Sequence, residues 1–136
     1  MDNTILRWCV ILVLLAHGVG HILGFLVSWT SISAGFAHQP WVLSDGITIE
    51  SPVGRAFGLL WLVAMIAFLG AGFGLLAHQD WWRFLAVAAA FISLVAILPW
   101  WNTVTPGARI GAVMVDILII AVLLPGWGEE IAQSIQ

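Results

Sequence analysis

Apolar residues gather along this chain in four long stretches, which are separated by short polar segments and by one longer connection. The stretches cover about residues 5–28, 53–77, 82–100 and 107–125. An α-helix needs about 20 apolar residues to cross the hydrocarbon core of a bilayer. The pattern therefore predicts an all-α fold in which four transmembrane helices form one antiparallel bundle, a single domain over residues 1–136.

The segments between these stretches carry helix-start and turn signals. Ser51 and Thr105 each precede a proline, which is typical of a helix N-terminus. Residues 29–51 form the one long connection, and a Ser-Asp-Gly turn within "WVLSDGITIE" separates two short β-prone runs. This loop predicts either a short β-hairpin over the membrane surface or an irregular interfacial loop.

Composition agrees with a membrane location. The chain is 62% hydrophobic and 8% charged, with a mean hydropathy of +1.07, whereas soluble domains carry about 25% charged residues. The net charge of −3 and the absence of a basic run argue against nucleic acid as a partner. We therefore expect the lipid bilayer as the main partner, together with other membrane subunits or further copies of the chain.

Tryptophan positions support the same four spans. Trp favours membrane–water interfaces, because its ring is apolar and its N–H needs a hydrogen-bond partner. Only Trp61 lies inside a span, where it packs in the core or lines a pocket. The others lie near predicted span ends: Trp8, Trp81, Trp82 and Trp127 at the face of the termini, and Trp29, Trp41, Trp100 and Trp101 at the opposite, loop face.

The arginines divide evenly between the two faces. Arg7 and Arg83 lie at the face of the termini and Arg55 and Arg109 at the loop face, so the positive-inside rule does not decide the orientation. We place both termini in the cytoplasm, because the long loop carries acidic residues but no Lys or Arg before Arg55. The expected location is a bacterial inner membrane, which the chain crosses several times.

Few polar side chains fall at membrane depth, and such groups usually face the bundle interior and mark a site. His17 and His21 share one face of the first span with Gly20 and Gly24, a GxxxG pair. Helical rise places Asp116 ~14 Å below the loop face, between the two histidines at ~16 and ~10 Å. Because the first and fourth helices of an up-down bundle are usually neighbours, the sequence predicts an Asp–His contact near mid-membrane.

Three further polar residues complete the set of candidates. Ser93 in the third span lies at a similar depth, and Arg55 and Arg109 lie closer to the loop face. Together with the two histidines and the aspartate they are candidate ligand-binding or proton-handling residues, in a pocket that opens toward the loop face. The alternatives are structural: the polar layer fixes the register of the bundle, and the arginines anchor to lipid head groups.

We expect no metal site, although the residues leave one alternative. His17 and His21 at i,i+4 with Asp116 match the three-ligand pattern of a catalytic metal, but H-x-x-x-H alone is a weak signal. The two histidines share one helix, so we do not expect this chain alone to hold a haem; the alternative is a haem with one axial ligand from this chain and the other from another subunit. The sequence encodes no cofactor motif, and without a self-contained catalytic motif it leaves open whether the protein is an enzyme.

The segment "HGVGHILGF" resembles the first span of the DoxX-like family of small four-helix bacterial membrane proteins. That family tends to carry an HG pair, then a basic residue, then a GF pair, which match His17 with Gly18, His21, and Gly24 with Phe25. His21 stands where the family usually has lysine. The resemblance implies a four-helix fold and quinone-dependent or other membrane redox partnerships. Because the chain encodes no redox cofactor, we expect a partner subunit to supply the electrons.

Two functions from different classes follow. The first is a site that binds a quinone or another isoprenoid-type lipophile, in a protein that serves as a subunit of a membrane redox system. The second is a non-catalytic accessory subunit of a larger membrane complex. That alternative rests on small-residue pairs that suit helix packing, at Gly54 and Gly58, Gly70 and Gly74, and Gly107 and Gly111.

Overall fold

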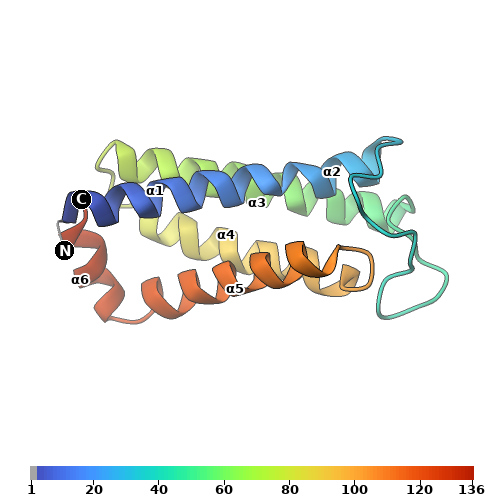
Figure 1. Cartoon of the computed structure of the whole chain (residues 1–136). Coiled ribbons are helices and arrows are strands. Elements are labelled where there is room, and N and C mark those ends of the chain that lie inside the picture. Colours follow the sequence, from blue (N-terminus) through green and yellow to red (C-terminus); the bar gives the residue numbers. More distant parts are fainter. Residues whose placement is uncertain (1–2) are drawn as a thin grey trace.

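The computed structural model describes residues 3–136, and no strand occurs among them. The elements are α1 (Asn3–Gly20), α2 (Ile22–Trp29), α3 (Pro52–Leu76), α4 (Trp82–Ile97), the 3₁₀ turn η1 (Leu98–Trp100), α5 (Pro106–Leu123) and α6 (Trp127–Ser134). Figure 1 shows α1 and α2 following one another along the first pass, after which α3, α4 and α5 run back and forth along the same axis. The start of α1 and the end of α6 therefore lie at the same end of the molecule.

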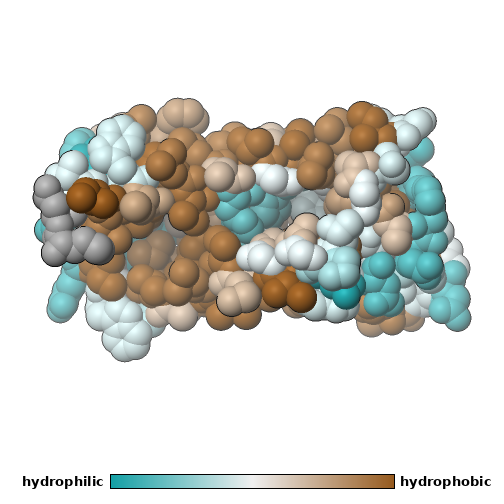
Figure 2. Space-filling view, in the orientation of Figure 1, coloured by the Kyte–Doolittle hydropathy of each residue, from teal (hydrophilic) through white to brown (hydrophobic). Residues whose placement is uncertain are grey.

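Four helical passes are long and apolar enough to cross a membrane, which confirms the four predicted spans. They are Asn3–Trp29, Pro52–Leu76, Trp82–Trp100 and Pro106–Leu123, with 27, 25, 19 and 18 residues. In Figure 2 hydrophobic residues cover the long sides of the molecule, and hydrophilic residues gather at the loop end. This distribution suits a multi-pass integral membrane protein.

The first pass contains a break that the hydrophobic pattern does not predict. The backbone N–H of His21 donates to the carbonyl of Gly18 at 3.0 Å, three residues back instead of four. The freed carbonyl of His17 accepts from the ring Nδ1 of His21 itself, at 2.9 Å. A side chain inserted into the i→i−4 ladder interrupts a helix, so the expected helix over residues 5–28 is divided into α1 and α2.

The helices pack around α3, which contacts α1, α2 and α4, whereas α5 packs against α4 and α6. Buried apolar side chains form two clusters. One lies toward the termini around Phe68 and Trp82, and the other toward the loop around Trp61 and Trp100. His17 and His21 on the first pass, Ser93 on α4 and Asp116 on α5 fall between the buried residues of these two clusters.

The loop between α2 and α3 is irregular, and the alternative of a β-hairpin does not form. The Ile47 N–H donates to the Ser44 carbonyl at 3.5 Å and closes the Ser-Asp-Gly turn, and one bond spans it, from the Trp41 N–H to the Ile47 carbonyl at 2.9 Å. Two other backbone N–H groups of the loop pair outside it. That of Ala37 donates to the Thr103 carbonyl, and that of Val42 donates to the Pro99 carbonyl. The connection between α4 and α5 therefore supplies the partners that a second strand would have offered.

The helix ends show which start signals operate. The Ser51 hydroxyl accepts from the Gly54 N–H at 3.1 Å and Pro52 occupies the first turn of α3, as predicted. Thr105 precedes α5 but makes no side-chain cap. The sequence pattern predicts no element after residue 125, yet α6 forms and buries Gly128 and Ala132 against the end of the bundle.

Three arginines bind the carbonyl groups at helix ends. Arg7 donates to the Leu75 and Leu76 carbonyls at 3.3 and 3.0 Å, and Arg83 donates to the Leu123 carbonyl at 2.7 Å. Arg109 donates to the Trp101 carbonyl at the end of the third pass. The last carbonyls of a helix lack intrahelical partners and attract cations, so these arginines are part of the fold.

The tryptophans divide between interface and core. Trp8, Trp81 and Trp127 are 51%, 49% and 60% exposed at the end that holds the termini, as interfacial residues should be. Trp82 and Trp100 stand at the two ends of the third pass but are fully buried, so their rings face the bundle interior and not the surroundings. Their large rings fill the ends of the bundle interior instead.

Candidate functional site

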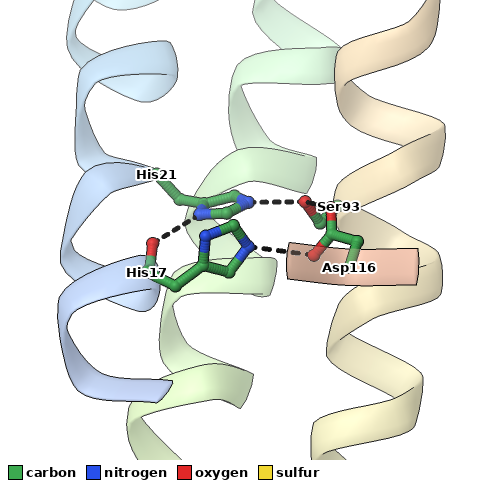
Figure 3. A network of polar contacts seen from close by, with 4 residues as sticks. All are labelled: His17, His21, Ser93 and Asp116. Carbon is green, nitrogen blue, oxygen red and sulfur yellow. Dashed lines mark hydrogen bonds and ion pairs between the residues drawn. The ribbon is translucent and has the colours of Figure 1, made fainter. Parts of the chain in front are cut away.

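Four polar side chains meet in the middle of the bundle. His17 and His21 come from the first pass, Ser93 from α4 and Asp116 from α5, and Figure 3 shows them pointing toward one another across the space between these helices. Asp116 lies ten residues beyond Pro106, or about 15 Å along α5. The group therefore lies near mid-membrane, as the sequence predicts.

Hydrogen bonds connect all four residues, which we call the polar network. His17 Nε2 lies 2.9 Å from Asp116 Oδ1, and Ser93 Oγ lies 2.5 Å from Asp116 Oδ2. His21 Nε2 lies 2.7 Å from Ser93 Oγ, and its Nδ1 donates to the His17 carbonyl. The expected Asp–His contact is present, and Ser93 joins the second histidine to the same carboxyl group (Figure 3).

The network is enclosed on most sides by apolar groups. Ser93 and Asp116 are 0% exposed and His21 is 5% exposed. The Phe68 ring of α3 covers one side, with its centroid 4.7 Å from that of His17 and 5.5 Å from that of His21. Toward the termini the apolar cluster around Phe68 closes the bundle.

The remaining side of the network borders a cleft of about 250 Å³ between the first pass and α5. Figure 2 shows it as a hollow on the long side of the molecule, with hydrophilic surface at its floor. The cleft is mainly apolar and runs from the histidines toward the loop end. It is lined by Ala16, His17, Gly20, His21, Leu23, Gly24, Phe36, Trp61, Ile97, Val104, Ala108 and Ala112.

This cleft corrects two expectations. The sequence predicts that the first and fourth helices are neighbours; the first pass and α5 are joined by the His17–Asp116 bond, but a gap separates them toward the loop. The site therefore opens on the long side of the bundle (Figure 2), whereas the sequence predicts an opening toward the loop face. A lateral opening in a membrane protein gives access to the lipid phase.

The two glycines of the first-pass GxxxG pair have different surroundings. A Cβ at Gly24 would overlap the Trp61 indole, so this glycine allows α2 to pack on α3. A Cβ at Gly20 would meet nothing within 4 Å, and Gly20 lines the cleft. The pair is therefore not one helix-packing surface. Trp61, which is 2% exposed, serves both as core residue and as cleft wall.

Arg55 and Arg109 do not join the polar network. Arg109 stacks over the Trp101 ring and binds its carbonyl. Arg55 lies over the Trp29 ring and lines a second cavity of about 460 Å³ beneath the loop, which contains neither of the network histidines. This larger cavity is bordered by the exposed His38–Glu50 pair, whose atoms are 3.3 Å apart.

The ligand atoms of the polar network do not converge on one point. Both ring nitrogens of His21 are engaged, with the His17 carbonyl and with Ser93, and the Nε2 of His17 faces Asp116. Within residues 3–136 no group of three His, Cys, Asp or Glu side chains is arranged to hold a metal ion. The three-ligand alternative is therefore not the arrangement that these residues adopt.

The polar members of the site were predictable, and most of the cleft wall was not. Phe36, Ile97, Val104, Ala108 and Ala112 are apolar residues from four different segments, and nothing in their local sequence distinguishes them from other membrane-facing residues. The break at His21 was also missed. Its signal was the histidine itself, since an imidazole can bond the carbonyl four residues back.

Comparison with protein-family models, with curated proteins and with solved structures finds no match to this chain. The resemblance to the DoxX-like family therefore rests on the residues of the first span alone.

Proposed function

We propose that the cleft between the first pass and α5 binds the head group of an uncharged, isoprenoid-type lipophile, of which a quinone is the leading example. The observation that carries this proposal is a mainly apolar, laterally open cleft that is lined by the two histidines of the polar network. Sites for small apolar ligands have this character, with few polar groups that fix the orientation.

The size of the cleft supports a head group with its tail outside. Cavities that enclose a whole drug-sized molecule measure about 300–1,000 Å³, and this cleft measures about 250 Å³. A single ring fits such a volume, and a long isoprenoid tail does not. Because the cleft opens on the long side of the bundle, the tail has room in the surrounding lipid (Figure 2).

The charges near the cleft argue against a phospholipid. Arg55 and Arg109 are the arginines of the loop half, and neither lines the cleft. An ionised head group without a partner is costly at mid-membrane depth. An uncharged polar head group that forms one hydrogen bond suits the site better.

A matched pair of glycine variants tests the proposal. Gly20 and Gly111 both lie on exposed helix surface, where an added Cβ would meet nothing within 4 Å, but only Gly20 lines the cleft. We expect Gly20→Leu to abolish saturable binding of a short-chain isoprenoid quinone by purified protein, and Gly111→Leu to retain it. Equal binding by both variants and the parent would remove the proposal.

One observation supports the alternative function, that of an accessory subunit in a larger membrane complex. Gly54, Gly58, Gly70 and Gly74 all contact other parts of this chain, whereas Gly107 and Gly111 on α5 face open space. The Gly111→Leu variant therefore tests this role too. If α5 packs on another membrane subunit, the variant lowers the size of the particle obtained after gentle extraction, while Gly20→Leu does not.

A further inference from the structure

The hydrogen bonds of the polar network determine how many protons it holds. The network has four bonds: His21 Nδ1 to the His17 carbonyl, His21 Nε2 to Ser93 Oγ, Ser93 Oγ to Asp116 Oδ2, and Asp116 Oδ1 to His17 Nε2. Each bond needs one hydrogen between its two heavy atoms. Two neutral histidines, one serine and one ionised aspartate supply only three. A complete network therefore contains one additional proton.

Two arrangements of this proton complete all four bonds. In the first, Asp116 is protonated and donates to Ser93, and Ser93 donates to a neutral His21. In the second, His21 is an imidazolium that donates to Ser93, and Ser93 donates to an ionised Asp116. The two differ only in the positions of the hydrogens along the His21–Ser93–Asp116 line, which Figure 3 shows as continuous.

Both arrangements have zero net charge, as their burial demands. Removing the extra proton leaves a net negative charge and a bond without a hydrogen, and adding another leaves a net positive charge. A net charge among residues that are 0–5% exposed is costly. The 2.5 Å between Ser93 Oγ and Asp116 Oδ2 is the separation of a strong O–H···O bond, so a hydrogen must lie between them.

The proton count has a consequence for the ring of His17, which lines the cleft. All four protons lie within the four bonds, so none remains for Nδ1, the second ring nitrogen of His17. Among the described residues, this nitrogen has no hydrogen-bond partner, and His17 lines the cleft. The neutral network therefore offers the cleft a hydrogen-bond acceptor and not a donor.

No other member of the network can take this role. His21 Nδ1 ends on a backbone carbonyl, which has no proton to pass on, and Ser93 and Asp116 are fully enclosed. The apolar cluster around Phe68 separates the network from the end that holds the termini. His21 also lines the cleft, but both of its ring nitrogens are engaged, so hydrogen bonding between the network and a ligand is confined to His17.

We propose that the cleft selects ligands whose head group carries a hydroxyl, such as a phenol, a hydroquinone or a prenol, over ligands that present only a carbonyl. This inference rests on the proposed function and specifies which form of the lipophile the site prefers. The ligand hydroxyl donates to Nδ1 of His17, whereas a quinone carbonyl would face the same lone pair and form no hydrogen bond.

Three probes that carry the same prenyl tail test this selectivity: a phenol, the methyl ether of that phenol, and a benzoquinone. The phenol and its ether differ in one donor hydrogen and need no control of redox state. We expect calorimetric titration in one detergent to give about tenfold tighter binding for the phenol than for the ether or the quinone, the factor expected for one hydrogen bond. The same titration of the Gly20→Leu variant, whose cleft is filled, measures the signal that comes only from partition of each probe into the detergent micelle.

The outcomes separate the two proposals. If the quinone or the ether binds as tightly as the phenol, and all three lose binding in Gly20→Leu, the acceptor assignment fails while the lipophile site stands. If every probe binds the variant as well as the parent, the lipophile site itself fails.

A direct readout of the ring nitrogens needs no ligand. Nitrogen-15 NMR of histidine-labelled protein, with His38→Gln and His78→Gln to remove the two other histidine signals, reports protonation at each ring nitrogen. We expect a protonated Nδ1 on His21 and an unprotonated Nδ1 on His17. A proton on Nδ1 of His17 in the ligand-free protein would overturn the inference.

Discussion

Replacing Ser93 by alanine removes a single oxygen atom from the centre of the polar network. That oxygen lies 2.7 Å from His21 Nε2 and 2.5 Å from Asp116 Oδ2, and the residue is fully buried. The variant therefore leaves two buried polar atoms, His21 Nε2 and Asp116 Oδ2, without a partner. Each such group costs about 1–3 kcal/mol, so we expect the free energy of unfolding to fall by about 2–6 kcal/mol.

Ser28→Ala is the matched control. Ser28 is 2% exposed, and its hydroxyl donates only to the carbonyls of Gly24 and Phe25 on its own helix. These are local bonds to the preceding turn, and removing them leaves no charged or titratable group unpaired. The same chemical change at similar burial should therefore cost less than about 1 kcal/mol.

Equilibrium unfolding of the parent and both variants in one detergent measures the difference. Native-like helix content by circular dichroism in all three is the control for correct folding. If Ser93→Ala and Ser28→Ala are destabilised equally, the hydrogen bonds of Ser93 do not hold the network together, and the proton count loses its basis.

Further variants test other parts of the structure. Asp116→Asn should change the unfolding free energy by less than about 1 kcal/mol, because the amide donates to the serine and accepts from His17; a larger loss would show that the network needs a carboxyl group. Gly24→Ala should destabilise by about 1–3 kcal/mol through overlap with the Trp61 indole, whereas Gly20→Ala, with nothing within 4 Å of its Cβ, should not; equal stability of the two would contradict the packing described. Arg83→Gln should cost about 1–3 kcal/mol and speed amide exchange in α6, since it removes charged bonds to the end of α5; unchanged exchange would argue against this anchor.

Much of the fold and the polar part of the site follow from sequence for identifiable physical reasons. An apolar bilayer tolerates few hydrophilic residues, so span lengths and the rare polar positions are both informative. Helical rise, together with the expectation that the first and fourth helices are neighbours, places Asp116 beside His17 and His21, and the bond at 2.9 Å to His17 agrees. Ser93 is placed by depth in the same way, although depth gives no indication that it bridges His21 and Asp116.

Other features depend on how helices diverge, which local sequence does not encode. Arg55 and Arg109 lie in the loop half of the bundle, as their depth predicts. Their side chains, however, point away from the polar network and lie over the rings of Trp29 and Trp101. The cleft exists because α5 packs on α4 and diverges from the first pass toward the loop. Tertiary contacts determine this divergence. The apolar surfaces of Trp82 and Trp100 are likewise buried by neighbours distant in sequence.

The second cavity offers a clear comparison for the location of the ligand. The cavity beneath the loop is larger, at about 460 Å³ against about 250 Å³, but it lacks His17 and His21. It lies at the membrane surface and is bordered by charged side chains. A lipophile that recognises the polar network must occupy the smaller cleft. The peptides that a bound photoprobe labels therefore distinguish binding in this cleft from binding in the cavity beneath the loop.

Photolabelling with an isoprenoid phenol whose ring carries a diazirine, followed by peptide mapping, locates the ligand. We predict saturable labelling within residues 16–24 and 104–112, which line the cleft, and loss of that labelling in the Gly20→Leu variant but not in Gly111→Leu. Labelling confined to residues 28–38 and 49–55 beneath the loop, or labelling that excess unlabelled phenol does not reduce, would contradict the proposed site.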